Sequence, residues 1–523
     1  MTTLRQRWAE LLFFVLVFVA VFCTSRDQLF LDPGTFWHTR TGDLLLERGF
    51  LDRDPFSYTY QGQTWIPSQW LAEIGMALLH RLQGLDALMW LTLSLVAGLF
   101  AFIGGRFVRH GCHPLLAGLF VALAFFASCY HFHTRPHLFT MVFLCGLFVS
   151  LQGFEAGRVP LRRLWWLVPV FAIWTNLHGG MLAGLGTFGL CGIGWGLLFL
   201  AGQPSPLRSW REVGELLLIG VLCGLTVFVN PYGWRLPWMW WIIMKADLPA
   251  IIMEHRPLNP FDEVGLAILL LAVVYAVFLA GLTVRPRVTW LLPLVWLVLA
   301  WSRIRNGPLF CFVTALALAE MLPHTRWMQG LARRSDMFLM PAQVTALLAP
   351  ARGVLRLPWW PALLPLPFLL TGLLGPQVLL DRKHWPLDLL DTLRVEAAKP
   401  NARFFHDDMY GGFFIYYLPG TPVFLDDRCE LYAQPLPRPD GTLREALLLD
   451  YARGRFHEPA RFNRWSQEFG FTHALVRKKD PKEQTTPDLF LEYLSRSPDW
   501  DLMPASSPAA YLFRRKGWTG AND

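Results

Sequence analysis

The run QGLDALMWLTLSLVAGLFAFIG, residues 83–104, is the stretch of sequence that decides the fold class. It is almost wholly apolar, and about 20 such residues are what an α-helix needs to cross the hydrocarbon core of a bilayer. Runs of the same kind recur on both sides of it. The candidate spans number eleven, at 8–25, 83–104, 114–131, 138–154, 164–177, 180–201, 214–230, 263–283, 288–302, 307–322 and 357–377. The sequence therefore predicts a polytopic α-helical membrane protein.

Charged residues divide the chain near residue 378. Only 16% of the 523 residues are charged, against about 25% in soluble proteins. Residues 379–523 carry 20 basic and 21 acidic residues, whereas residues 1–378 carry 27 and 18. We expect a membrane body over 1–378 and a soluble domain over 379–523. The basic excess belongs to the membrane body and is not clustered, so it indicates contact with membrane lipids and argues against nucleic acid as a partner.

The orientation follows from short arginine-rich segments that alternate with more polar loops. Such segments stay on the cytoplasmic side of a membrane. Their pattern predicts a cytoplasmic N-terminus and, with eleven spans, a C-terminal domain on the outer face. In a bacterium this is a multi-pass protein of the inner membrane with a periplasmic or extracellular domain. The first apolar run lacks a small-residue cleavage site, so we interpret it as an uncleaved anchor.

Polar residues gather in the first outer loop, residues 26–82, which we call the first loop. It is long enough for interfacial helices, for example over 37–48 and 69–81. Seven of the 18 acidic residues of the membrane body lie in it: Asp27, Asp32, Asp43, Glu47, Asp52, Asp54 and Glu73. We therefore expect the chemistry of the protein on the outer side of the membrane.

The C-terminal domain alternates strand-like and helical segments, which predicts a small α/β layer domain. The expected strands are 402–406, 422–427 and 472–479, the expected helices are 387–399, 411–418, 443–454 and 459–470, and the tail 500–516 resembles a hairpin. Two acidic pairs, 407–408 and 426–427, follow strand-like runs. They either form functional loops or close turns and cap helices. Because the domain starts directly after the last span, we expect it to pack over the outer loops and to bring both pairs toward a cavity beside Asp32.

Asp32 is the best-placed candidate for a general base, since it follows the first span and precedes a Pro-Gly turn; the alternative is an exposed loop acid. Arginines and a histidine that return to the same side of the membrane form a second candidate group. Guanidinium groups match phosphate oxygens in pairs, so these residues are candidates to bind a lipid phosphate, or else they pair with headgroups and outer acids. They are Arg135, His137, Arg256, Arg303 and Arg305.

A metal is not expected. His131, His133 and His137 have ligand-like spacing, but no carboxylate cluster is near them in the sequence. None of the eight cysteines forms a CxxC pair, which argues against a zinc site and a disulfide framework.

Several short motifs, taken together, resemble one family. They are D-P-x-x-x-W-H-x-x-x-G at 32–42, DPFS at 54–57, QWL at 69–71, RPHLFT at 135–140, NLHGG at 176–180, NPYG at 230–233, MYGGFFIYYL at 409–418 and VFLDDRCELY at 423–432. They are similar to motifs of bacterial polytopic membrane proteins of the GT-C glycosyltransferase class. Those proteins are distant relatives of the dolichyl-phosphate-mannose mannosyltransferase and lipid A arabinosyltransferase families.

The resemblance implies a GT-C-like fold and the transfer of a sugar from a polyprenyl-phosphate-linked donor to an acceptor at the outer face. The lipid-linked sugar is a substrate, and no cofactor is implied. Asp32 matches the acidic residue that acts as general base in the class. The expected substrate-binding residues are Trp37, His38, Trp65, Gln69, Asn176 and His178.

The chain departs from the pattern of the class at two positions. Gly34 stands where related chains often carry a second acid, and Gln69 stands where they often carry glutamate. These departures favour an alternative, in which a non-catalytic GT-C-like subunit binds a partner protein through its outer domain.

Overall fold

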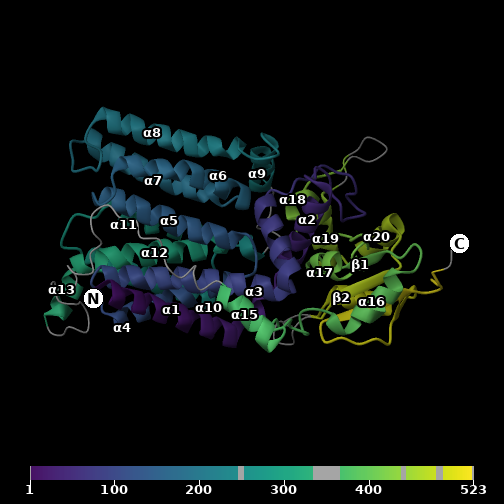
Figure 1. The fold of residues 1–523 in the computed structure, drawn as a ribbon. Helices are drawn as coiled ribbons and strands as arrows, with labels where there is room; N and C mark the ends of the chain where they lie inside the picture. Colours follow the sequence, from purple (N-terminus) through teal and green to yellow (C-terminus); the bar gives the residue numbers. More distant parts are fainter. Residues whose placement is uncertain are drawn as a thin grey trace.

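The apolar run 83–104 lies within helix α3 (Trp70–Arg109), which is buried in the helical bundle of the computed structural model (Figure 1). The structure describes residues 2–245, 253–333, 365–436, 443, 445–478 and 487–520. The helical geometry of α3 breaks at Gln83 and Gly84, and Gly84 has a φ of +62°, a conformation that favours glycine. The part before this kink corresponds to the interfacial helix expected at 69–81, and the part after it to the predicted span.

The other helices of the bundle each overlap a predicted apolar run or connect two of them. They are α1 (Thr2–Ser25), α4 (Pro114–Phe126), α5 (His137–Glu155), α6 (Leu167–Leu177), α7 (Met181–Leu200), α8 (Trp210–Leu225), α9 (Arg235–Lys245), α10 (Glu263–Ala280), α11 (Val288–Ser302), α12 (Gly307–Met321), α13 (Arg326–Ala332) and α15 (Pro365–Leu374). Most of the long helices run side by side in Figure 1.

Six helices within the described part of the chain are long and apolar enough to cross a membrane. They are Arg7–Ser25, Trp70–Arg109, His137–Glu155, Met181–Leu200, Glu263–Ala280 and Ile304–His324, and the apolar helices α4 and α11 are shorter. Large apolar side chains on the outside of the bundle, such as Ile193, Leu217 and Val273, are more than half exposed. A helix with an apolar outer face is typical of contact with lipid. The chain is therefore a mostly helical protein with candidate membrane spans, and the count of eleven stays a prediction.

A smaller mixed part follows the bundle, and we call residues 376–523 the C-terminal part. Its sheet has the strand order β1-β2-β4-β3, with β1 parallel to β2 and the other pairs antiparallel. The strands are β1 (Phe404–His406), β2 (His473–Arg477), β3 (Trp500–Leu502) and β4 (Ala510–Arg515). The helices are α16 (Leu390–Ala397), α17 (Met409–Tyr417), α18 (Cys429–Tyr432), α19 (Leu447–Phe456), α20 (Arg461–Phe469) and α21 (Leu489–Arg496).

The segment 422–427, expected as a strand of this sheet, is not part of it. Val423 forms a parallel bridge with Ser57 of the first loop instead. Its apolar neighbours Phe424 and Leu425 are fully buried. The apolar residues that made the segment look like a strand are buried against the first loop. Burial alone does not specify which backbone a segment pairs with.

The first loop and the C-terminal part share one hydrophobic core, which contains Phe36, Trp37, Tyr60 and Trp65 from the first loop. Helix α2 (Gly34–Arg48) lies against α17 of the C-terminal part. A Cβ atom at Gly412 would lie 2.4 Å from the carbonyl oxygen of Pro33, so this close approach requires glycine. The C-terminal part therefore packs on the first loop, as its short connection to the bundle predicts.

A buried arginine holds this contact together. The Arg428 guanidinium pairs with Asp54 of the first loop at 2.8 Å and with Asp426 at 2.7 Å, and all three side chains are inaccessible to solvent. The same guanidinium lies 4.6 Å from the ring centre of Trp65.

The acidic pair 407–408 has different partners, because Asp407 accepts hydrogen bonds from Arg455 and Tyr451. The prediction that the 407–408 pair faces a cavity beside Asp32 is therefore wrong for Asp407, whose carboxylate binds Arg455 and Tyr451 within the C-terminal part, and the Asp408 carboxylate accepts a hydrogen bond from the same Tyr451.

We expect Arg428→Ala to lower the free energy of unfolding by about 3–5 kcal/mol, because it leaves two buried carboxylates without their cation. Chemical unfolding of the detergent-purified protein measures this loss. The control is Arg382→Ala, which removes an exposed ion pair with Asp388 and should cost about 0–1 kcal/mol. Equal losses in the two variants would contradict the role of Arg428 as the buried joint.

Candidate functional site

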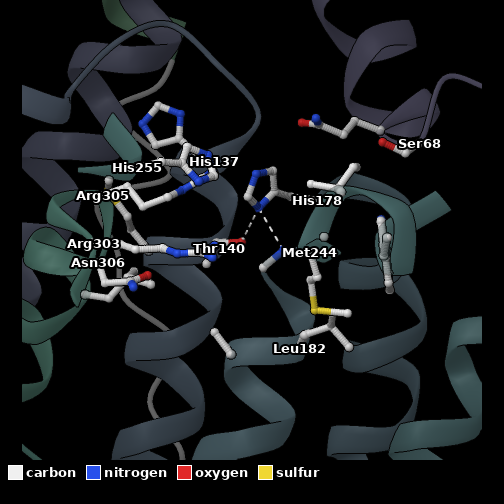
Figure 2. A pocket seen from close by; sticks show the side chains of 18 of the residues that line it. Ser68, His137, Thr140, His178, Leu182, Met244, His255, Arg303, Arg305 and Asn306 are labelled. Atoms are coloured by element: carbon white, nitrogen blue, oxygen red, sulfur yellow. Dashed lines mark hydrogen bonds between the residues drawn. The ribbon is translucent and has the colours of Figure 1, made fainter. Parts of the chain in front are cut away.

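A pocket of about 350 Å³ lies at the end of the bundle where α5, α7 and α12 begin (Figure 2). It is lined by Ser68, Gln69, His131, His137, Thr140, Met141, His178, Gly179, Gly180, Leu182, Ala183, Trp240, Ile243, Met244, His255, Arg303, Arg305, Asn306 and Leu309. We call it the basic pocket, since two arginines and four histidines line it and none of these lining residues is acidic. The apolar side chains of Leu182 and Met244 lie on the side away from Arg303 and Arg305 (Figure 2).

Three helix N-termini meet at the basic pocket. His137 is the first residue of α5, Gly180 is the N-cap of α7 and Asn306 is the N-cap of α12, and all three line the pocket. The unpaired N–H groups and the dipole of a helix N-terminus favour negative charge. The pocket therefore combines two guanidinium groups with three helix ends of the same polarity, which suits a phosphate-like anion.

Arg305 is positioned by the loop that carries it. Its Nη1 atom donates a hydrogen bond to Nε2 of His255. The loop itself is held by Tyr130, whose hydroxyl donates to the Ile304 carbonyl at 2.6 Å. Burial and the charges of Arg305 and Arg303 lower the pKa of His255 to about 4. His255 is therefore neutral at pH 7, where it accepts a hydrogen bond from Arg305 and does not repel it.

The orientation of His178 follows from a chain of hydrogen bonds. The Trp174 indole N–H donates to the Thr140 hydroxyl at 2.9 Å, so that hydroxyl donates its own hydrogen to Nδ1 of His178 at 2.8 Å. The Gly180 N–H donates to the same Nδ1 at 3.0 Å (Figure 2). Burial, followed by the charges of Arg305 and Arg135, lowers the pKa of His178 to about 3. The neutral ring then carries its proton on Nε2, which makes it a hydrogen-bond donor.

A second group of charged side chains lies beside the pocket: Asp32, Arg135 and Asp427, which we call the carboxylate–arginine group. Nη1 of Arg135 is 2.8 Å from Oδ2 of Asp32, and its Nη2 is 3.7 Å from Oδ2 of Asp427. Oδ1 of Asp32 accepts the Gly34 N–H at 2.7 Å. Asp32 is therefore a largely buried, paired carboxylate, so its alternative as an exposed loop acid is wrong.

The two carboxyl groups differ in their protonation. Burial raises the pKa of Asp32, but Arg135, His133 and the Gly34 N–H outweigh it and bring the pKa below its ordinary value. Burial and the charges of Asp32 and Asp426 raise the pKa of Asp427 well above its ordinary value, against the effect of Arg135. Oδ1 of Asp427 is buried and has no hydrogen-bond partner among the described residues. The environments of the two groups thus push their pKa values apart, with Asp32 the stronger acid and Asp427 the weaker one, a separation typical of acid–base sites.

Five of the residues predicted from the sequence line the basic pocket together: Gln69, His137, His178, Arg303 and Arg305. Arg135 lies next to it in the carboxylate–arginine group and pairs with Asp32. The Arg256 side chain is exposed and outside the pocket, although its carbonyl accepts the Ile304 N–H at 2.9 Å.

Four predicted substrate-binding residues have structural contacts instead. Trp37 and Trp65 are buried in the core shared with the C-terminal part, which leaves no open ring face for a sugar. His38 is fully buried and bonds Glu73 at 2.8 Å. Asn176 accepts the Trp70 indole N–H at 2.6 Å and donates to the Val229 carbonyl at 2.8 Å. The aromatic and polar composition of the first loop thus serves its packing as well as the site.

The sequence analysis missed Thr140 and left the role of Asp427 open. Thr140 lies one turn into an apolar helix, and its sequence position gives no sign of its contact with His178. Asp427 follows a strand-like run, which was the available signal, but its proximity to Arg135 depends on how the C-terminal part docks.

We expect Asp427→Asn to become more stabilising as the pH rises. Because the pKa of Asp427 is raised above its ordinary value of 3.8 in the folded protein, this group lowers the free energy of unfolding of the wild type as the pH rises. The neutral amide of the variant makes no such contribution. Unfolding midpoints at pH 4 and pH 8 measure this, and the variant-minus-wild-type difference should be larger at pH 8. Asp391→Asn, at an exposed side chain, is the control. A difference that is constant or falls with pH would contradict the assignment.

Comparison with known proteins gives no family for this chain: no family model matches it, and no curated protein does. The resemblance of its motifs to the GT-C class therefore stays a prediction. A functional proposal starts from the basic pocket and from the carboxylate–arginine group beside it.

Proposed function

We propose that this protein is a membrane glycosyltransferase that transfers a sugar from a polyprenyl-phosphate-linked donor to an acceptor. The observation that carries the proposal is the basic pocket, where Arg303, Arg305 and three helix N-termini converge and none of the lining residues that the structure describes is acidic. Such a pocket suits a phosphate. Its position in a bundle with candidate membrane spans suits a phosphate attached to a lipid.

The apolar side of the pocket supports a lipid-linked ligand over a free anion. Met141, Leu182, Met244 and Leu309 line the pocket as well, and Figure 2 shows Leu182 and Met244 on the side away from Arg303 and Arg305. A polyprenyl phosphate presents an anionic head and an apolar chain, so it matches both kinds of wall. In this proposal Arg303, Arg305 and Nε2–H of His178 bind the phosphate, and Gln69 contacts the sugar at the rim.

The transfer itself uses the carboxylate–arginine group. The acceptor oxygen or nitrogen bonds to the anomeric carbon while the bond from that carbon to the phosphate oxygen breaks. The electron pair of the broken bond leaves with the polyprenyl phosphate, whose negative charge Arg303 and Arg305 stabilise. The acceptor proton passes to the ionised carboxylate of Asp32, which Arg135 holds in place.

A second candidate function has its own observation. Both oxygens of Asp32 already accept hydrogen bonds, from Gly34 and from Arg135. A carboxylate whose two oxygens both have partners fits a non-catalytic subunit, which binds a lipid phosphate and recruits a partner protein through the C-terminal part. The two candidates share phosphate binding and differ in turnover.

Turnover is tested by incubating the purified protein with labelled polyprenyl-phosphate sugars and measuring released polyprenyl phosphate. We expect release by the wild type, and Asp32→Asn should slow it by about 10²–10⁴-fold, the usual range for a lost general base. Full turnover by Asp32→Asn would exclude Asp32 as the base. Lipid binding without release, together with a co-purifying partner, would favour the non-catalytic subunit.

Phosphate binding is tested separately with Arg305→Met. Removing one preorganised donor to the leaving phosphate typically costs about 10²–10³-fold in rate, and we expect a loss of this size. The same variant should bind polyprenyl phosphate more weakly in a detergent-based binding assay. Arg208→Met, at an exposed arginine outside the pocket, is the matched control and should behave as the wild type. Equal behaviour of the two variants would mean that the phosphate binds elsewhere.

A further inference from the structure

His131, which lines the basic pocket, comes together with His133 and Glu254. We call these three residues the histidine–glutamate cluster. Each offers one nitrogen or oxygen atom, and these atoms all lie within 4.8 Å of one another. Nδ1 of His131 is 3.7 Å from Oε1 of Glu254. The carboxylate comes from more than a hundred residues along the chain, which is why the histidines alone gave no expectation of a metal.

The backbone around the two histidines is fixed from both sides. The Thr134 N–H donates to the Leu29 carbonyl at 2.9 Å, and the Thr134 carbonyl accepts the Thr35 hydroxyl at 2.7 Å. Nε2 of His137 donates to the His131 carbonyl at 2.8 Å. His137 therefore supports His131 through the His131 backbone carbonyl, while Nδ1 of the His131 side chain lies beside Glu254.

His133 carries the second observation. Its Nδ1 atom is buried and has no hydrogen-bond partner among the residues that the structure describes. A buried polar atom without a partner lowers the stability of the folded state. A ligand that binds the lone pair of this nitrogen removes the loss. The atom belongs to one of the three side chains whose donor atoms already lie close together.

We propose that the histidine–glutamate cluster binds a divalent transition-metal ion. Two imidazoles and one carboxylate form a mixed N,N,O set of the kind that Zn²⁺, Co²⁺ or Mn²⁺ accepts. Magnesium and calcium prefer oxygen ligands and are expected to bind more weakly. Three protein ligands leave at least one position of the ion open.

The charges around the cluster predict when the ion binds best. Arg135 and Arg305 lie near it and oppose a cation, although Asp32 pairs with Arg135 and offsets its charge. An anion in the basic pocket offsets the remaining positive charge, and His131 lines both the pocket and the cluster. Metal binding and phosphate binding should therefore strengthen each other; this coupling, unlike the metal site itself, rests on the proposed function.

The first test measures Co²⁺ binding to the full-length protein, purified without a histidine tag, by visible absorption and by metal content after dialysis. We expect about one ion per chain in the wild type and visible bands from nitrogen coordination. His133→Ala and the near-isosteric Glu254→Gln should each weaken binding by about 10- to 100-fold or more, since even indirect partners of a metal have effects of this size. Binding should also weaken as the pH falls, because metal ligands must be deprotonated to bind.

The controls are His457→Ala and Glu263→Gln, both at exposed positions outside the cluster. They should bind Co²⁺ as the wild type does. Unfolding midpoints without metal show whether His133→Ala is folded, and Glu254→Gln keeps the test decisive if it is not. Wild-type affinity in Glu254→Gln, or an equal loss in the controls, would overturn the metal site.

The second test titrates Co²⁺ in the presence of inorganic pyrophosphate, with the metal's affinity for free pyrophosphate measured separately and subtracted. Tighter metal binding that Arg305→Met abolishes is the expected result. Metal binding that pyrophosphate leaves unchanged would overturn the coupling and leave the site itself in place. Turnover of the lipid-linked sugar by Glu254→Gln would show that the proposed function stands without the metal.

Discussion

The buried guanidinium of Arg428 is the contact on which the rest of the site depends. It neutralises Asp54 from the first loop and Asp426 from the C-terminal part in a region without solvent. Either carboxylate alone would be an unpaired buried charge, so each segment needs the other. Asp427 stands between Asp426 and Arg428 in the sequence. It lies close to Arg135 because the buried ion pairs hold its two neighbours in place.

The same end of the bundle contains both the joint and the basic pocket. Helices that begin there present N–H groups and positive dipole ends, and the arginines of the loop at 303–305 add full charges. The carboxyl groups beside the pocket come from the first loop, which contributes Asp32, and from the C-terminal part, which contributes Asp427. A single face of the protein thus contains the basic pocket with a pair of carboxyl groups beside it, of which Asp427 has the higher pKa.

The proposed functions differ in how they use this arrangement. A transferase needs Asp32 to give up a present hydrogen bond and to accept one from the acceptor substrate. The free-energy cost of this exchange depends on the 2.8 Å pairing of Asp32 with Arg135. A binding subunit needs no exchange. The histidine–glutamate cluster serves either function, because a cation at the wall of the pocket favours an anion inside it in both cases.

Composition and local pattern alone predicted the long apolar helices of the bundle, the helical segments on both sides of the kink in α3 and the mixed character of the C-terminal part. These features depend on apolar run length and on residue period, which each segment carries by itself. Only the tertiary structure decided which polar residues meet. Trp37 and Trp65 are buried in the core shared with the C-terminal part, Asp32 pairs with Arg135, and Glu254 lies beside two histidines. Each of these contacts joins residues that are distant in sequence. They therefore depend on how the separate loops pack at one end of the bundle.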